Sequence, residues 1–288
     1  MRIEKASKMG FCTGVRRAIS ILERTARQVG PLETLGPVVH NQQVIDGLAL
    51  TGIRVAESLD QVQGKLVAIS SHGVSPELLE EMERRGLKAI DTTCPFVRRA
   101  QVAARRLAEA GFFVIVFGEG SHPEVQGVLG WTRGKGVATL DLPRFDTLPR
   151  RIGILSQTTQ SFAGFARFVA EFVESGLAPL SELRVLNTVC DATRKRQQAA
   201  LELASRADVM FVVGGRSSAN TRRLAEICAS TGVDTHQIET SAEIDPSWLR
   251  NRCRVGVTAG ASTPDYAIDE VVTKLKHLDQ QGGNCGAG

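Results

Sequence analysis

Residues 94–100 read Cys-Pro-Phe-Val-Arg-Arg-Ala, and the same local pattern begins at two other cysteines of the chain. Residues 12–18 read Cys-Thr-Gly-Val-Arg-Arg-Ala, and residues 190–196 read Cys-Asp-Ala-Thr-Arg-Lys-Arg. In each copy a basic pair begins four residues after the thiol, and a helical pattern follows. The cysteines are 82 and 96 residues apart, which indicates one cysteine in each of three repeats.

Short runs rich in Val and Ile alternate with helical patterns through the whole chain. Six of these runs end in a polar loop, at 34–41, 66–76, 112–124, 152–161, 209–221 and 255–264. Strands that alternate with helices are typical of parallel sheets joined by crossover helices. The sequence therefore predicts an α/β fold, with three small modules of parallel sheet in a pseudo-threefold trefoil.

The repeats also predict the domain boundaries. The first module is expected at 12–94, the second at 95–189 and the third at 190–279. The third module lacks a last strand of its own, so we expect the N-terminal segment 1–11 to complete it. The Gly-rich end at 280–288 is expected to be a disordered tail.

Composition narrows the class of protein. The 288 residues are 42% hydrophobic and 23% charged, which is ordinary for a soluble globular protein. A formal charge of +4 suits an anionic ligand, but with 5% aromatic residues it gives no case for nucleic acid. The start of the chain is polar, and its apolar runs are too short to cross a membrane. We therefore expect a cytoplasmic protein with reduced thiols and no nucleic-acid or membrane partner.

The repeated cysteines are the strongest candidates for a metal centre. Each is expected to close a strand and open a helix, where the helix dipole favours a thiolate. Three thiolates around one centre leave an open position, either on a four-coordinate metal or on one iron of a cubane cluster. Isolated cysteines favour the cluster, but their spacing alone leaves zinc as an alternative.

Other residues near these motifs have plainer interpretations. Cys228 and Cys253 are predicted to be packing residues, and Cys285 is predicted to have no role. The basic pairs after the repeated cysteines are either solvated helix faces or charges that offset a thiolate-bound cluster. The sequence does not decide between these two.

Polar residues gather at the expected carboxyl ends of the strands, where ligands bind in parallel sheets. Three histidines lie on equivalent loops, namely His40, His72 and His122. The other loops carry Thr158, Ser218, Asn220 and Ser262. Hydroxyl and amide residues routinely cap helices, and a helix N-terminus can also bind a phosphate. Together the loops resemble a site for an anion.

Glu124 follows Pro123 at an expected helix start, as Glu77 follows Pro76. An acid behind such a proline is a normal first helical turn, and this is our interpretation of Glu77. For Glu124, the adjacent His122 favours a proton donor equally well. The residues alone leave both interpretations of Glu124 open.

Several motifs occur in the order expected for a known enzyme family. They are Gly10-Phe11-Cys12-Thr13-Gly14-Val15, Val39-His40-Asn41, Ser71-His72-Gly73, Thr93-Cys94-Pro95, His122-Pro123-Glu124-Val125, Gln157-Thr158-Thr159, Asn220 in its Ser-rich loop, and Gly260-Ala261-Ser262-Thr263-Pro264. Over nearly its whole length the chain resembles the 4-hydroxy-3-methylbut-2-enyl diphosphate reductases of the non-mevalonate isoprenoid pathway. Ala219 departs from the pattern, since many relatives carry a second serine at this position.

The resemblance implies a [4Fe–4S] cluster at the centre of the trefoil. Its ligands would be Cys12, Cys94 and Cys190. The substrate diphosphate would be bound by His40, His72, His122, Ser218, Asn220 and Ser262. Glu124 would donate the proton, and Thr158 would help to orient the substrate hydroxyl.

The implied activity is a reductive dehydration. An allylic diphosphate would lose its hydroxyl as water, giving isopentenyl diphosphate and dimethylallyl diphosphate, with reduced ferredoxin or flavodoxin as electron donor. Two other activities remain as alternatives. A non-redox iron–sulfur hydro-lyase would turn over without a reductant, and a metal-linked diphosphate-binding sensor would bind its ligand without consuming it.

Overall fold

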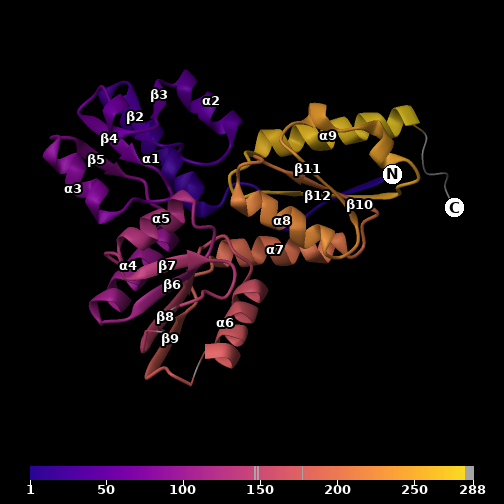
Figure 1. The fold of residues 1–288 in the computed structure, drawn as a ribbon. Coiled ribbons are helices and arrows are strands. Elements are labelled where there is room, and N and C mark those ends of the chain that lie inside the picture. The colour runs from indigo at the N-terminus through magenta and orange to yellow at the C-terminus, as the bar shows by residue number, and fades with distance from the viewer. Residues whose placement is uncertain (146, 148, 177, 283–288) are drawn as a thin grey trace. The chain divides into compact units, whose positions relative to one another are not determined.

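The computed structural model describes residues 1–145, 147, 149–176 and 178–282. The chain forms two compact units, each continuous in space but not in sequence (Figure 1). Unit 1 contains residues 1–15, 39–46 and 191–288, and unit 2 contains residues 16–38 and 47–190. In the described part of the chain, no helix is both long and apolar enough to span a membrane.

Unit 2 contains two four-stranded sheets, in which every pair of neighbouring strands is parallel. The first has the order β3-β2-β4-β5, with strands β2 (Leu32–Leu35), β3 (Ile53–Ala56), β4 (Leu66–Ile69) and β5 (Lys88–Asp91). The second has the order β7-β6-β8-β9, with strands β6 (Phe113–Phe117), β7 (Gly136–Thr139), β8 (Arg151–Ser156) and β9 (Glu182–Leu186).

Helices connect these strands. In chain order they are α1 (Thr13–Val29), α2 (Gln42–Leu50), the short 3-10 helix η1 (Leu59–Gln61), α3 (Pro76–Arg84), α4 (Pro95–Glu109), α5 (Pro123–Gly130) and α6 (Phe162–Gly176). Serine caps α3 and histidine caps α5, and a proline follows each cap. These starts agree with the Pro-acid pattern in the sequence.

Unit 1 contains the third parallel sheet, of order β1-β12-β10-β11. Its strands are β1 (Arg2–Lys5), β10 (Val209–Val213), β11 (Asp234–Ile238) and β12 (Arg254–Ala259). Its helices are α7 (Asp191–Ala204), α8 (Ala219–Ala229), η2 (Ser241–Glu243), η3 (Pro246–Leu249) and α9 (Asp265–Gly282). Strand β1 pairs with β12, so the N-terminal strand lies at the edge of a sheet whose other strands are distant in sequence.

The three sheets share one topology. In each, the first strand of a repeat lies between the second and third, and a fourth strand pairs with the third; in unit 1 this fourth strand is β1. The predicted α/β class with three parallel-sheet modules is confirmed. Because the repeats fold alike, loops at equivalent sequence positions lie at equivalent strand ends.

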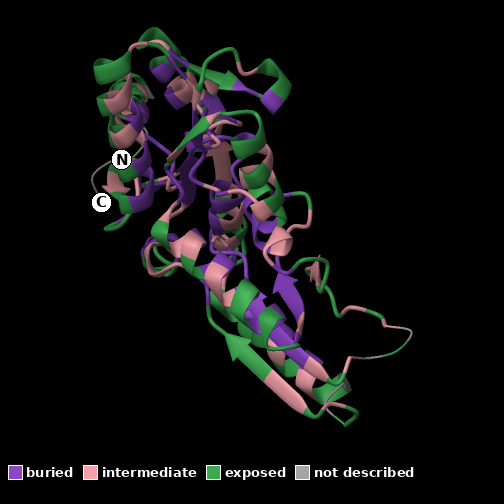
Figure 2. Ribbon diagram, turned by 90° about the vertical axis from the view of Figure 1, so that its left-hand side faces the viewer, coloured by how far each residue is buried: buried purple, intermediate pink, exposed green. Residues whose placement is uncertain are grey.

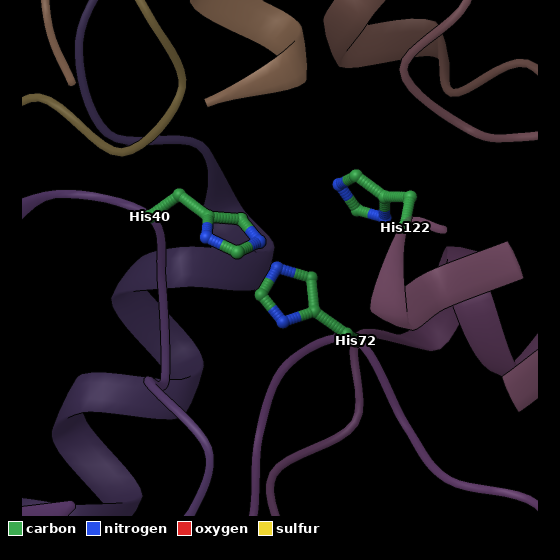
Figure 3. A group of neighbouring side chains, drawn as sticks. All are labelled: His40, His72 and His122. Carbon is green, nitrogen blue, oxygen red and sulfur yellow. The ribbon is translucent and has the colours of Figure 1, made fainter. Parts of the chain in front are cut away.

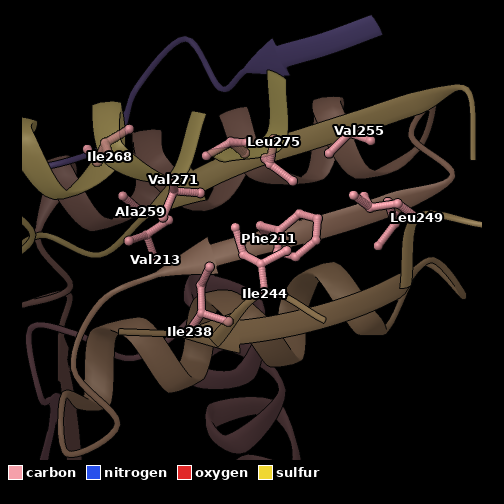
Figure 4. Packing of buried hydrophobic residues seen from close by; sticks show 12 residues of the cluster. Phe211, Val213, Ile238, Ile244, Leu249, Val255, Ala259, Ile268, Val271 and Leu275 are labelled. Carbon is pink, nitrogen blue, oxygen red and sulfur yellow. The ribbon is translucent and has the colours of Figure 1, made fainter. Parts of the chain in front are cut away.

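Apolar helix faces cover the sheets. Figure 4 shows Ile268, Val271 and Leu275 of α9 together with Phe211 and Val213 of β10, in one cluster of buried residues. Figure 2 shows helices with both buried and exposed stretches, as expected for amphipathic helices on a sheet. Burial of these faces, at about 25 cal/mol per Å² of apolar surface, holds the strand ends in place.

The expectation that the cysteines close strands is corrected. Strand β5 ends at Asp91 and β9 ends at Leu186, so a short loop precedes Cys94 and Cys190. Strand β5 ends at Asp91 because the hydroxyl of the next residue, Thr92, donates to the carbonyl of Ile69 at 2.5 Å. This side-chain hydrogen bond takes the place of a main-chain hydrogen bond of the sheet.

Two smaller predictions are also corrected. The prediction of a disordered tail from residue 280 is wrong for residues 280–282, because helix α9 continues to Gly282. Gln280 and Gln281 are good helix formers, so the helix ends only where the glycines begin. Residues 283–288, with Cys285, lie outside the described residues. Cys228 is fully buried as predicted, but Cys253 is exposed where the chain enters β12 from a surface loop.

Candidate active site

The repeated cysteines occupy three equivalent turns. Each follows an edge strand, and its N–H donates at 3.0 Å to a carbonyl in the loop after the neighbouring strand. The donor–acceptor pairs are Cys12 with Ala261, Cys94 with Ser71, and Cys190 with Thr158. A helix then begins within one residue of each cysteine. The matched sequence positions therefore correspond to matched backbone geometry.

Side chains hold the turns before Cys94 and Cys190 in the same way. Three residues before each cysteine, Asp91 or Asn187 accepts from the N–H two residues further on, at 2.9 and 3.1 Å. Two residues before it, Thr92 or Thr188 donates its hydroxyl to a carbonyl of the neighbouring strand. Each turn is thus closed by its own local sequence.

The thiols suit a role as metal ligands. Cys12, Cys94 and Cys190 are partly exposed thiols without a disulfide, and Cys12 Sγ accepts from the Val15 N–H at 3.3 Å. The start of a helix offers free N–H groups to a sulfur in this position. Cys228 is the contrasting case, because burial raises the pKa of its thiol to about 12. The donor set fits a cluster held by three thiolates.

Glu124 and Thr158 form a buried polar contact in unit 2. Glu124 is 2% exposed, and its two carboxyl oxygens lie 2.6 Å from the Thr158 nitrogen and 2.8 Å from the Thr158 hydroxyl. Helix α5 presents Glu124, and the loop after β8 presents Thr158. The two residues are 34 positions apart in sequence, so only the fold joins them.

Burial dominates the electrostatics of this carboxyl group. Loss of hydration raises the pKa of Glu124 above its ordinary value of 4.5, although the two hydrogen bonds from Thr158 oppose this. The carbonyl of Thr158 accepts the N–H of Cys190, so the carboxyl group is connected directly to a cysteine turn. A carboxyl of raised pKa in this position can hold and deliver a proton.

Two of the predicted histidines are neighbours in unit 2. The rings of His72 and His122 meet edge to face, with centroids 5.5 Å apart (Figure 3). His122 caps helix α5, and its Nδ1 accepts the Glu124 N–H at 3.1 Å. His72 Nδ1 lies 3.3 Å from the Ser70 hydroxyl. Thus unit 2 joins His72, His122, Glu124 and the two cysteine turns through direct contacts.

Unit 1 brings together another set of predicted residues. The carbonyl of His40 accepts from the Ser262 hydroxyl at 3.4 Å. It also approaches Gly215 so closely that a Cβ there would lie 2.6 Å from the oxygen, which makes glycine necessary. Gly215 accepts the N–H of Ser218, the cap of helix α8. The three loops that carry His40, Ser218 and Ser262 are therefore in contact.

Ser218 and Asn220 lie at the N-terminus of α8. Ser218 caps the helix by accepting from the Thr221 N–H at 3.3 Å, so the capping interpretation holds for this hydroxyl. Asn220 is 8% exposed, and its Nδ2 has no hydrogen-bond partner among the described residues. A buried amide without a partner costs free energy, and an anion at the helix start would satisfy it.

The sequence predicted no role for Gln157, although this residue belongs to the motif Gln157-Thr158-Thr159. Gln157 is 1% exposed, and its Oε1 accepts from the Glu119 N–H at 3.0 Å, while its Nε2 has no partner within the described part of the chain. The feature of the sequence that could have indicated a role for Gln157 is its position directly before Thr158. Nothing in composition distinguished it from a loop glutamine.

This architecture defines a class of α/β enzyme that builds its site on the carboxyl-end loops of parallel sheets. The LytB protein family model matches residues 3–276. A protein of Dehalococcoides mccartyi (strain CBDB1), named 4-hydroxy-3-methylbut-2-enyl diphosphate reductase, is 50% identical over 96% of this chain and 99% of its own. A Geobacter metallireducens protein of the same name is 44% identical over 97% and 98%.

Solved structures agree. The reductase from Plasmodium falciparum has a TM-score of 0.89 at 26% identity, over 95% of this chain and 87% of its own. A structure described as the terminal enzyme of the non-mevalonate pathway has a TM-score of 0.67 at 38% identity, over 96% and 99%. The chain belongs to the LytB family, whose curated relatives are oxidoreductases by name.

Proposed function

We propose that this chain is a reductive dehydratase, with the 4-hydroxy-3-methylbut-2-enyl diphosphate reductase activity for which its relatives are named. It converts 4-hydroxy-3-methylbut-2-enyl diphosphate to isopentenyl diphosphate and dimethylallyl diphosphate. Two electrons and two protons enter, one C–O bond breaks, one C–H bond forms, and water leaves. The observation that carries the proposal is Glu124, a buried carboxyl of raised pKa that Thr158 connects to the turn of Cys190.

The cysteine turns are the proposed cluster ligands. Cys12, Cys94 and Cys190 would hold a [4Fe–4S] cluster, which when bound supplies single electrons and a Lewis-acidic iron. Their support comes from the repeat, because the backbone N–H of each of the three cysteines donates to a loop carbonyl at 3.0 Å. Cys228 is excluded from this role by its full burial in an apolar cluster.

Glu124 is the proposed proton donor. Its raised pKa keeps the carboxyl protonated to higher pH than an exposed glutamate, and the proton can pass to the departing hydroxyl so that it leaves as water. The hydroxyl of Thr158 is 2.8 Å from the carboxyl and can accept or donate, so it can orient both groups.

The proposed diphosphate ligands are six polar residues of the strand-end loops. They are His40, His72, His122, Ser218, Asn220 and Ser262, as the resemblance to the family implies. The best support for this anion site is Asn220 at the start of α8, because its buried Nδ2 donor has no hydrogen-bond partner among the described residues. Anchoring the diphosphate would orient the small allylic end of the substrate.

The electron donor is proposed to be reduced ferredoxin or flavodoxin. A two-electron reduction through a one-electron centre requires a donor that delivers electrons singly, and both proteins do so. A formal charge of +4 favours an acidic protein of this kind.

The test is anaerobic purification, with iron and sulfide analysis, EPR and turnover with and without a chemical reductant. We expect cluster iron and sulfide, an EPR signal on reduction, and conversion of the diphosphate only when reductant is present. Turnover without reductant would identify a hydro-lyase instead. Diphosphate binding without any product would identify a sensor.

A further inference from the structure

The turn before Cys12 lacks the side-chain contacts that hold the two equivalent turns. The positions that correspond to Asp91 and Thr92 are Met9 and Gly10, which have no polar side chain. The carbonyl of buried Gly10 therefore needs a partner from elsewhere in the fold.

Arg196 of helix α7 supplies that partner. Its Nε and Nη2 both donate to the Gly10 carbonyl, at 3.1 and 2.7 Å, and its Nη1 donates to the Ala192 carbonyl at 2.9 Å. Arg196 is only 7% exposed, and 186 positions separate it from Gly10. A buried guanidinium that places two donors on one carbonyl fixes both its position and its direction.

The rest of the segment is equally constrained. Gly10 has a φ of +70°, and a Cβ there would lie 3.1 Å from Ile268 Cδ1, so no other residue fits without strain. Its N–H donates to the Ala259 carbonyl at 3.4 Å, and the Cys12 N–H donates to Ala261 at 3.0 Å. With the Arg196 contact, both faces of this short turn are held.

We propose that Arg196 is a positioning residue for Cys12, replacing across the fold the local side chains that hold Cys94 and Cys190. The role rests on the proposed function, because it concerns the cluster that these cysteines would hold. Arg196 fixes the direction of the Cys12 thiol and places a permanent positive charge beside the ligand turn. The charge favours the more negative, reduced state of a cluster.

Arg17 provides a weaker example in unit 2. It is exposed, and a single Nη1 donates to the carbonyl of Thr93, directly before Cys94, at 3.2 Å. Since Asp91 and Thr92 already close that turn, the loss of Arg17 should matter less.

The experiment compares R196Q, R196K and R17Q with the wild-type holoenzyme after anaerobic reconstitution. The rate of iron release to a chelator and the cluster's midpoint potential are measured. R151Q is the matched control, because Arg151 also donates to a backbone carbonyl, that of Ala110 at 2.6 Å, but at the amino end of β8. Thermal unfolding of each variant shows how far the fold alone is weakened.

We expect R196Q to release iron roughly 10- to 100-fold faster than wild type, the usual scale for removing a residue that supports a ligand. Its midpoint potential should become more negative. R196K should restore most of the midpoint potential, because it keeps the positive charge. It should restore little of the iron retention, because lysine lacks the two guanidinium donors that bind the Gly10 carbonyl together. R17Q should show the smaller effect on release, and R151Q should lose stability only.

Two results would overturn the positioning role. One is R196Q with wild-type iron release and potential. The other is equal acceleration in R196Q and R151Q at equal loss of stability, which would mean a purely structural arginine. If R196Q does not fold, R196K decides the question by the same two measurements. A wild-type protein that binds no cluster contradicts the proposed function itself, and the positioning role with it.

Discussion

Replacement of Glu124 by glutamine tests the proton donor most directly. The amide keeps the shape of the side chain and can still accept from the Thr158 N–H, now at 2.6 Å from the carboxyl oxygen. It cannot deliver a proton. We expect turnover to fall by roughly two orders of magnitude or more, the scale for removing a positioned acid, which corresponds to about 2.7 kcal/mol in the barrier.

Glu77→Gln is the matched control. Glu77 follows Pro76 in the first turn of α3 as Glu124 follows Pro123 in α5, but Glu77 is exposed. As an exposed acid of a first helical turn, it interacts favourably with the helix dipole, so its replacement should cost less than about 1 kcal/mol of stability and leave turnover nearly unchanged.

The same variant has a signature in stability against pH. Burial raises the folded-state pKa of Glu124 above the ordinary 4.5, so the protonated form is the one that the fold favours. Its contribution is fully present below the unfolded pKa and is lost as pH rises through the folded pKa. Relative to Glu124→Gln, the wild type should therefore lose stability from about pH 4.5 upward.

The assay is anaerobic turnover with a chemical reductant at equal cluster content, followed by urea unfolding at pH 5 and pH 8. Comparable turnover in Glu124→Gln and Glu77→Gln would mean that Glu124 is only a first-turn acid and that the proton comes from elsewhere. A stability difference that does not grow between the two pH values would contradict the raised pKa.

Three further predictions concern the proposed cluster ligands and the proposed diphosphate ligands. Cys94→Ser should lose most of the cluster iron, whereas Cys228→Ser, at a buried thiol on α8, should keep it. Iron analysis and EPR measure the cluster content, and full iron in Cys94→Ser would exclude Cys94 as a ligand. Asn220→Ala should bind an inert diphosphate analogue about 10- to 150-fold more weakly, which corresponds to the loss of one charge-assisted hydrogen bond. The affinity is measured by calorimetry, and an unchanged value would mean that Asn220 does not bind the diphosphate. His72→Asn and His122→Asn should each weaken the same analogue, and unchanged affinity in both would show that these rings do not face the diphosphate.

Sequence alone determined much of this protein because the information was local and repeated. Alternating apolar runs predicted parallel sheets with crossover helices, and the matched residues around Cys12, Cys94 and Cys190 predicted one cysteine at the start of a helix in each of three repeats. Helix starts at Pro76 and Pro123 were also visible. Such patterns depend on neighbours within a few residues, and these are printed in the sequence itself.

The tertiary structure alone decided the state of Glu124 and the support of Cys12. The Pro-acid motif is the same in α3 and α5, but only the fold buries Glu124 and places Thr158 against it, from 34 positions away. Nothing in the basic residues after Cys190 showed that Arg196 binds the Gly10 carbonyl 186 positions earlier. Burial and long-range hydrogen bonds arise only when distant segments pack, and the pKa of a carboxyl group or the direction of a thiol depends on that packing.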